Sequence, residues 1–274
     1  MINGKYINNE NDLINTISNY ILNYSVALVK IKPQSDSDFQ EMPIGSGTLI
    51  KNNSYIGLLT ARHVIETLDR DDYLGLTICP LKQIHRFEIP IKAIQITNIN
   101  EIGKTGKPDI SLLKIPEFYK GTIEASKSFY DIEHTKLKYK KLFYKIKTNT
   151  HFVSFGIIGK FTRNVKGEKG FKEVIKLESK CIFCGKNNIY TENEYDYIKL
   201  DIDYELAASH IPDSVAGISG GGIWCVFIKN EKDKIILEDI IYCGLNIQET
   251  EIDSKNHKNI VGHFYSSIYN NILV

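Results

Sequence analysis

The feature that most constrains the fold is a succession of short apolar runs of β type, which begins near Val26. The runs are rich in Val, Ile, Tyr and Thr, and clusters of Gly, Asn, Asp and Lys separate them. They read SVALVKI, GSGTLI, YIGLLT, LGLTIC, RFEIPI and ISLLKI, then HFVSFGII, KEVIKLES, YDYIKLDI, GGIWCVFI and DIIYCGLNI. No long helical pattern lies between them, so we expect an all-β barrel or sandwich and not a parallel α/β sheet.

Both ends of the chain carry helical patterns. Near the N-terminus, Asn-Asn-Glu-Asn supplies capping residues for a helix with one apolar face. That face comprises Leu13, Ile14, Ile17, Tyr20, Ile21 and Tyr24. The C-terminal FYSSIYNNILV predicts a second, short helix. We therefore expect a helix at each end of a β domain.

The chain divides into two halves of similar size near residues 120 to 148. With 274 residues, it can bury a large core without disulfides to stabilise it. The dividing segment, TKLKYKKLFYKIK, interleaves basic and apolar residues. Its plain interpretation is a solvated strand or connector, and the alternative is a patch that binds nucleic acid or an acidic partner.

Charge and composition exclude several classes of protein. Because 34 basic residues face 33 acidic ones, we expect neither a nucleic acid nor a membrane as the main partner. The N-terminus has no signal-peptide pattern, and no apolar run is long enough to cross a bilayer. Five cysteines, an odd number, favour a reducing compartment. We expect a cytoplasmic protein, although a secreted chain after signal removal would look the same.

A glycine-rich segment, Gly217-Ile218-Ser219-Gly220-Gly221-Gly222, precedes an apolar strand. Glycines around a serine allow a tight turn that exposes its hydroxyl, and they let backbone N–H groups approach one point. A developing oxyanion needs such donors. Taken alone, the segment is equally compatible with an ordinary turn between strands.

A serine hydroxyl needs a neighbouring base to become a nucleophile. Among seven histidines, His63 stands out because it follows the run YIGLLTAR where a strand breaks into a turn. Asp109 lies at the start of another apolar strand, ISLLKI, where a buried carboxylate could orient an imidazole. A structural histidine and a turn aspartate after proline are the alternatives.

Three segments, in this order, resemble motifs of the trypsin-like serine protease superfamily. They are Thr60-Ala61-Arg62-His63-Val64, Pro108-Asp109-Ile110-Ser111-Leu112-Leu113 and Gly217-Ile218-Ser219-Gly220-Gly221. Strand segments Gly45-Ser46-Gly47-Thr48-Leu49-Ile50, Val153-Ser154-Phe155-Gly156 and Gly244-Leu245-Asn246 are also similar to the family, the latter two to its bacterial members.

The resemblance implies two perpendicular six-stranded antiparallel β-barrels in one peptidase domain that spans residues 1–274. Barrel 1 would cover about 25–120 and barrel 2 about 148–265. His63, Asp109 and Ser219 would form the catalytic triad, and the N–H groups of Gly217 and Ser219 the oxyanion hole. The implied reaction is hydrolysis of a protein or peptide substrate through an acyl-enzyme, with no cofactor and no metal.

The resemblance also implies a primary specificity pocket. Asp213, six positions before Ser219, would form an acidic floor and favour Lys or Arg before the scissile bond. Gly244 and Gly262 would belong to the pocket walls. The alternative for Asp213 is a solvated loop residue.

Two departures from the family pattern concern activation. Ile218 stands where digestive members carry an aspartate that pairs with a new N-terminus, and Gly222 replaces a common proline. We therefore expect activation by a protein partner or by substrate, with a more flexible oxyanion loop. A catalytically silent or gated binding and sensor module is the alternative function. Cys181 and Cys184 form half of a zinc motif that nothing completes.

Overall fold

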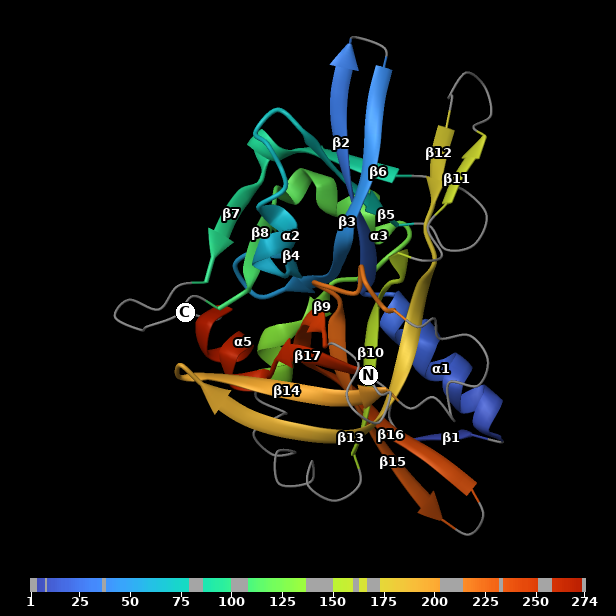
Figure 1. Cartoon of the computed structure of the whole chain (residues 1–274). Coiled ribbons are helices and arrows are strands. Elements are labelled where there is room, and N and C mark those ends of the chain that lie inside the picture. Colours follow the sequence, from blue (N-terminus) through green and yellow to red (C-terminus); the bar gives the residue numbers. More distant parts are fainter. Residues whose placement is uncertain are drawn as a thin grey trace.

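Two curled antiparallel β-sheets, with small helices at their margins, make up the described part of the chain (Figure 1). The computed structural model describes residues 4–7, 9–35, 38–78, 86–99, 108–136, 150–159, 163–166, 173–202, 214–231, 234–250 and 258–272. The basic stretch 136–147, apart from its first residue, and Asp213 lie outside these residues.

The first sheet contains strands from the first half of the chain. They are β2 (Ser25–Ser35), β3 (Asp38–Lys51), β4 (Ile56–Thr60), β5 (Tyr73–Thr77), β6 (Arg86–Pro90), β7 (Gln95–Asn98), β8 (Ser111–Ile115) and the short β9 (Tyr130–Asp131). Their order is β6-β5-β2-β3-β4-β8-β7, and β9 pairs with β3. Only a single 3-10 turn, η1 (Ile91–Ala93), separates β6 from β7. The two therefore act as one bent strand that pairs with β5 at one end and β8 at the other, which closes a six-stranded barrel.

The second sheet closes directly. Its strands are β1 (Lys5–Ile7), β10 (Thr150–Ile157), β13 (Ser179–Glu192), β14 (Tyr195–Ile202), β15 (Gly222–Glu231), β16 (Lys234–Glu249) and β17 (Asn259–His263). Their order is β1-β16-β15-β10-β13-β14-β17, and β16 also pairs with β17. Six strands thus form a closed ring, to which β1 adds at β16. A separate hairpin joins β11 (Arg163–Lys166) and β12 (Glu173–Lys176).

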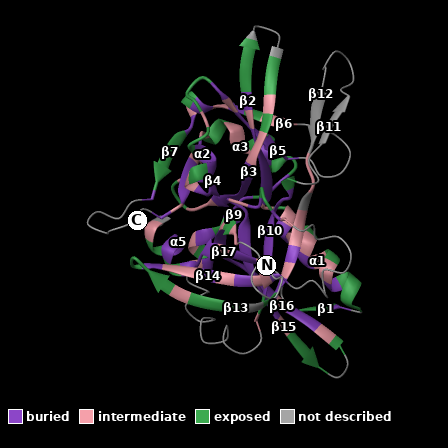
Figure 2. Ribbon diagram, viewed as in Figure 1, coloured by how far each residue is buried: buried purple, intermediate pink, exposed green. Residues whose placement is uncertain are grey.

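The all-β prediction with two six-stranded antiparallel barrels is confirmed. Each barrel buries the inner parts of its strands, while ends that project from the barrels, such as those of β2 and β15, are exposed (Figure 2). All five residues of β4 are buried, as are the first six residues of β15. Trp224, Tyr242, Phe152 and Phe155 are the largest side chains that are fully buried in the second barrel. Their burial supplies much of the apolar area removed from water on folding.

The two flanking helices are also confirmed. Helix α1 (Glu10–Leu22) begins after Asn9, whose side chain accepts the Asp12 N–H at 2.9 Å and caps the helix. Its buried residues, Leu13, Ile17 and Ile21, belong to the predicted apolar face. The other helical segments are α2 (Arg62–Ile65), η2 (Glu117–Tyr119), α3 (Lys120–Glu124) and α5 (Tyr265–Ile272). Within the described ranges, no helix has the length and apolar character needed to cross a bilayer.

Candidate active site

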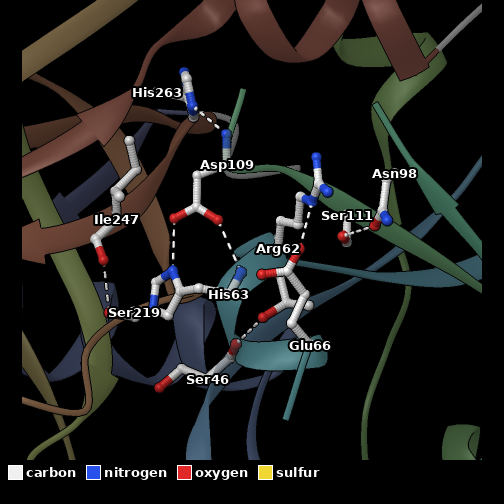
Figure 3. Close-up of polar contacts among 11 residues, drawn as sticks. Ser46, Arg62, His63, Glu66, Asn98, Asp109, Ser111, Ser219, Ile247 and His263 are labelled. Atoms are coloured by element: carbon white, nitrogen blue, oxygen red, sulfur yellow. Dashed lines mark hydrogen bonds and ion pairs between the residues drawn. The ribbon is translucent and has the colours of Figure 1, made fainter. Parts of the chain in front are cut away.

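His63 and Asp109 meet at one edge of the first barrel. Strand β4 ends at Thr60, which pairs with Ser111 at the start of β8, so the residues just beyond these strand ends lie side by side. His63 Nδ1 and Asp109 Oδ2 are 2.6 Å apart, and the His63 backbone N–H donates to Asp109 Oδ1 at 2.9 Å (Figure 3). Two hydrogen bonds from one residue therefore hold both carboxylate oxygens.

This pair shifts the pKa of each partner. The hydrogen bond to Asp109 raises the pKa of His63 above its ordinary 6.5, against the effect of partial burial. Burial alone would raise the pKa of Asp109, but the hydrogen bonds from His63 outweigh it, and the pKa is lowered. Asp109 thus stays ionised and stabilises the imidazolium form of His63, as a residue that orients a general base must.

A second histidine supports Asp109 from the opposite barrel. His263, the last residue of β17, is fully buried, and its Nε2 accepts the backbone N–H of Asp109 at 3.0 Å. Burial lowers the pKa of His263 to about 4, so its imidazole is neutral near pH 7. Nothing in the local sequence around His263 predicts this contact.

The serine segment forms a tight loop between residue 214 and β15. Gly217 and Gly220 have φ angles of +99° and +82°, which glycine adopts without strain. A side chain at Gly220 would also lie 2.2 Å from the carbonyl oxygen of Ser46. The predicted glycines are therefore needed both for the turn and for the close approach of the first barrel.

Asn246 of β16 anchors this loop to the second barrel. Its backbone accepts the N–H of Gly220 and donates to the carbonyl of Gly221, each at 2.8 Å. Its buried side chain donates to the Phe155 carbonyl and accepts the Ser154 hydroxyl, each at 2.9 Å. The loop is thus fixed to both β16 and β10.

The loop leaves two backbone donors unused. Among the described residues, no hydrogen bond uses the N–H of Gly217 or of Ser219. The carbonyls on the same peptide planes are held, because Ala216 accepts from Gly159 at 2.7 Å and Ile218 accepts from Gly221 at 2.9 Å. Since a peptide unit is planar, these bonds also fix the directions of the two free N–H groups. An oxyanion hole requires donors of this kind.

The loop contacts the first barrel beside His63. The Ser46 backbone N–H donates to the carbonyl of Ser219 at 2.9 Å, and the Ser46 hydroxyl donates to the carbonyl of Gly217 at 3.3 Å. A side chain at Gly45 would touch both the Ser219 carbonyl and Val64, the neighbour of His63. Figure 3 draws the Ser219 side chain with its bond to the Ile247 carbonyl, and the His63 imidazole with its bond to Asp109.

The Ser219 hydroxyl is engaged by a backbone carbonyl. It donates to the carbonyl of Ile247 at 2.6 Å. A hydroxyl has only one proton to donate, and no hydrogen bond of the described residues joins Ser219 to His63. The hydroxyl must therefore rotate away from the Ile247 carbonyl before any base can accept its proton.

No protein-family model and no curated protein matches this sequence. Several solved structures are similar in shape. Tobacco etch virus protease, complexed with product, matches with 10% identity and a TM-score of 0.41 over 93% of this chain and 79% of its own. Tobacco vein mottling virus protease gives 10% identity and a TM-score of 0.40 over 93% and 84%. These likenesses are too weak to assign an activity, and the bacterial affiliation stays a prediction.

Of the three residues predicted to form the specificity pocket, Gly244 and Gly262 lie in the described part of the chain. Asp213 lies outside the described residues, so the acidic floor stays a prediction. Gly244 and Gly262 are buried, and a side chain at either would press against Ile223 and neighbouring backbone, at 2.4 Å for Gly262. Close packing between β15, β16 and β17 accounts for both glycines, and their place in the pocket walls stays a prediction.

Packing also explains Gly222, which was expected to loosen the loop. It is the buried first residue of β15 and pairs with Leu245 of β16. A side chain there would lie 2.6 Å from the Trp224 ring nitrogen. The glycine therefore permits close packing inside the second barrel.

A carboxylate that the motifs did not indicate holds the start of the serine loop. Glu249, at the end of β16, accepts the Ser214 hydroxyl and the Val215 N–H, each at 2.6 Å. Lys258 lies 3.4 Å from the same carboxylate. The ion pair is mostly buried and fixes the chain just before the oxyanion segment.

The half zinc motif stays incomplete in the structure. Cys184 is buried in β13 and Cys181 is partly buried, and burial raises the pKa of the Cys181 thiol to about 12. Within the described ranges, no three His, Cys, Asp or Glu residues cluster as metal ligands would. Cys181 is therefore a thiol at neutral pH, and both cysteines pack as small apolar residues.

Proposed function

We propose that the protein is a serine endopeptidase of the trypsin-like type, with Ser219 as nucleophile, His63 as general base and Asp109 as the residue that orients His63. The observation that carries the proposal is the doubly hydrogen-bonded Asp109–His63 pair next to a serine loop with two free N–H groups. In this mechanism, His63 removes the hydroxyl proton as Ser219 attacks the peptide carbonyl. The N–H groups of Gly217 and Ser219 then stabilise the oxyanion, and His63 donates its proton to the leaving amine. Water hydrolyses the acyl-enzyme, and no cofactor or metal takes part.

Labelling with a fluorophosphonate probe tests this proposal directly, because the probe phosphonylates only an activated serine. Wild-type protein is expected to be labelled at Ser219, and the Ser219→Ala variant is not. Ser266, an exposed serine of α5, provides a matched control, since Ser266→Ala should label as wild type does. Absence of any Ser219-dependent label under all conditions tested would overturn the enzyme assignment.

The hydrogen bond from Ser219 to Ile247 supports a gated form of the same enzyme, in which a protein partner or the substrate itself completes the site. The hydroxyl must leave the Ile247 carbonyl before His63 can receive its proton. A gated enzyme would label slowly alone and faster with a peptide bound next to Ser219. Full hydrolysis of a simple peptide ester by the isolated chain would contradict the gating.

A preference for Lys or Arg before the scissile bond rests on Asp213 and is part of the proposal. Short substrates that differ only in Arg, Lys, Phe or Ala at this position test it, with Asp213→Asn beside wild type. Equal turnover of all four substrates by wild type would refute the acidic floor.

A further inference from the structure

His263 combines features that a merely space-filling core residue does not need. It is fully buried in β17 of the second barrel, yet one ring nitrogen is bound to the backbone of Asp109, which belongs to the first barrel. Burying an imidazole without using its polar atoms is unfavourable, and an aromatic ring without nitrogen would fill the same space at lower cost. The ring packs against Tyr197 and Tyr195 of β14, with centroids 4.6 Å and 6.1 Å away.

The hydrogen bond determines the tautomer of His263. Because Nε2 accepts the Asp109 N–H, that nitrogen carries no proton, and a neutral ring must carry its proton on Nδ1. Nδ1 has no acceptor at good hydrogen-bond geometry among the described residues. The backbone of Asp196 is among the groups that favour the protonated ring, although burial outweighs them. The ring is thus neutral, and it has one defined orientation, in which Nε2 faces the backbone N–H of Asp109.

Helix α5 fixes the surroundings of this ring. Asp196 accepts the backbone N–H groups of Ser266 and Ser267 through its carboxylate, at 2.8 Å and 2.5 Å. Its own carbonyl accepts the N–H of Phe264, which follows His263 in the chain. The charged and titratable groups that face His263 are therefore Asp109, Asp196, Tyr195 and Tyr197. The end of β17 is held on both sides.

We propose that His263 is a positioning residue of the Asp109–His63 pair. Its neutral imidazole holds the Asp109 backbone from the second barrel, so that the carboxylate faces His63 while Ser219 is held by the same barrel. The inference rests on the proposed function, because it assigns His263 a part in keeping the base aligned with the nucleophile. His263 itself touches neither substrate nor the reacting atoms.

The test compares His263→Phe, which keeps an aromatic ring but removes the acceptor, with His263→Gln, whose amide oxygen can reach the Asp109 N–H. His263→Phe is expected to slow fluorophosphonate labelling at saturating probe by about 10- to 100-fold, the usual cost of a lost hydrogen bond next to a charged group. It should also move the acidic midpoint of the rate profile to lower pH, since His63 would lose part of its stabilisation by Asp109. His263→Gln should recover most of both effects, and the control Tyr197→Phe should behave as wild type.

A wild-type rate and midpoint in His263→Phe would overturn the positioning role. So would a slower rate with an unchanged midpoint, because that result indicates a structural role only. If His263→Phe does not fold, as judged by thermal unfolding, His263→Asn replaces it, because its shorter amide cannot reach Asp109.

An NMR titration of the His63 imidazole in the same variants separates this inference from the proposed function, because it needs no catalysis. Positioning by His263 predicts a lower His63 pKa in His263→Phe than in wild type, whether or not the protein labels. An equal pKa in the two proteins refutes it, while the absence of wild-type labelling refutes only the enzyme assignment.

Discussion

The candidate site has two sides, and different interactions hold each of them in place. The base side is the Asp109–His63 pair, and the nucleophile side is the loop that carries Ser219. Asp109 and His63 are joined by a charge-assisted hydrogen bond of 2.6 Å, and each shifts the pKa of the other. Residues 217–221 of the serine loop are held by bonds between neutral groups, chiefly through Asn246 and Ser46, and only the start of the loop is held by a carboxylate, that of Glu249. The base side is therefore sensitive to pH, and the nucleophile side depends on shape.

The two sides also differ in whether their side chains already have the hydrogen bonds that the proposed reaction needs. On the base side both carboxylate oxygens of Asp109 already have their partners. On the nucleophile side the Ser219 hydroxyl is bound to Ile247. The proposed gate would therefore act at Ser219 and leave the His63–Asp109 pair as it is.

The largest effect is expected from Asp109→Asn, which removes the charge of the base side and keeps its shape. The amide cannot stabilise the protonated form of His63, so the labelling rate should fall by about 10⁴-fold. The His63 pKa, which Asp109 raises, should return toward 6.5. Because labelling needs neutral His63, the acidic midpoint should move to lower pH. A rate profile measured between pH 5 and 9 checks both effects, and an unshifted midpoint would contradict the role of Asp109.

The next largest effect concerns the shape of the nucleophile side. Gly220→Ala would place a methyl group 2.1 Å from the Thr60 hydroxyl and 2.2 Å from the Ser46 carbonyl, at a φ of +82°. We expect a loss of more than about 3 kcal/mol in the free energy of unfolding, through overpacking and backbone strain together. Gly121→Ala is the matched control, because nothing lies within 4 Å and Gly121 is helical. It should be neutral or stabilising by up to about 1 kcal/mol, and urea unfolding of both variants measures the difference.

The apolar runs between turn residues predicted the all-β class, and the resemblance to the trypsin-like family implied the two six-stranded barrels. YDYIKLDI corresponds residue for residue to β14, and GGIWCVFI begins one residue before β15. The strand β7 was missed because all four of its residues are exposed, so no apolar alternation marks it. The strand β1 was missed because three residues are too few for a pattern.

The candidate site was predictable only where it has a local motif. His63, Asp109 and Ser219 each lie in a recognisable segment, and the structure joins the first two by hydrogen bonds. His263 and Asp109 are 154 positions apart in the chain, and no local pattern can report such a contact. Asn246 and Ser46 did leave a signal, a polar residue within an apolar strand run, but that signal does not identify the partner.

The smallest effect is expected from Ser46→Ala, which changes the support of the serine loop and leaves the Asp109–His63 pair unchanged. The Ser46 hydroxyl donates to the Gly217 carbonyl at 3.3 Å and accepts the Ile157 N–H at 2.8 Å. Removing it leaves one buried donor unpaired and loosens the oxyanion segment, so labelling should slow by roughly 10-fold. The acidic midpoint should stay unchanged, because Ser46 touches neither Asp109 nor His63. A shifted midpoint in Ser46→Ala would mean that the loop and the pair respond as one unit, and the contrast between the two sides would then be wrong.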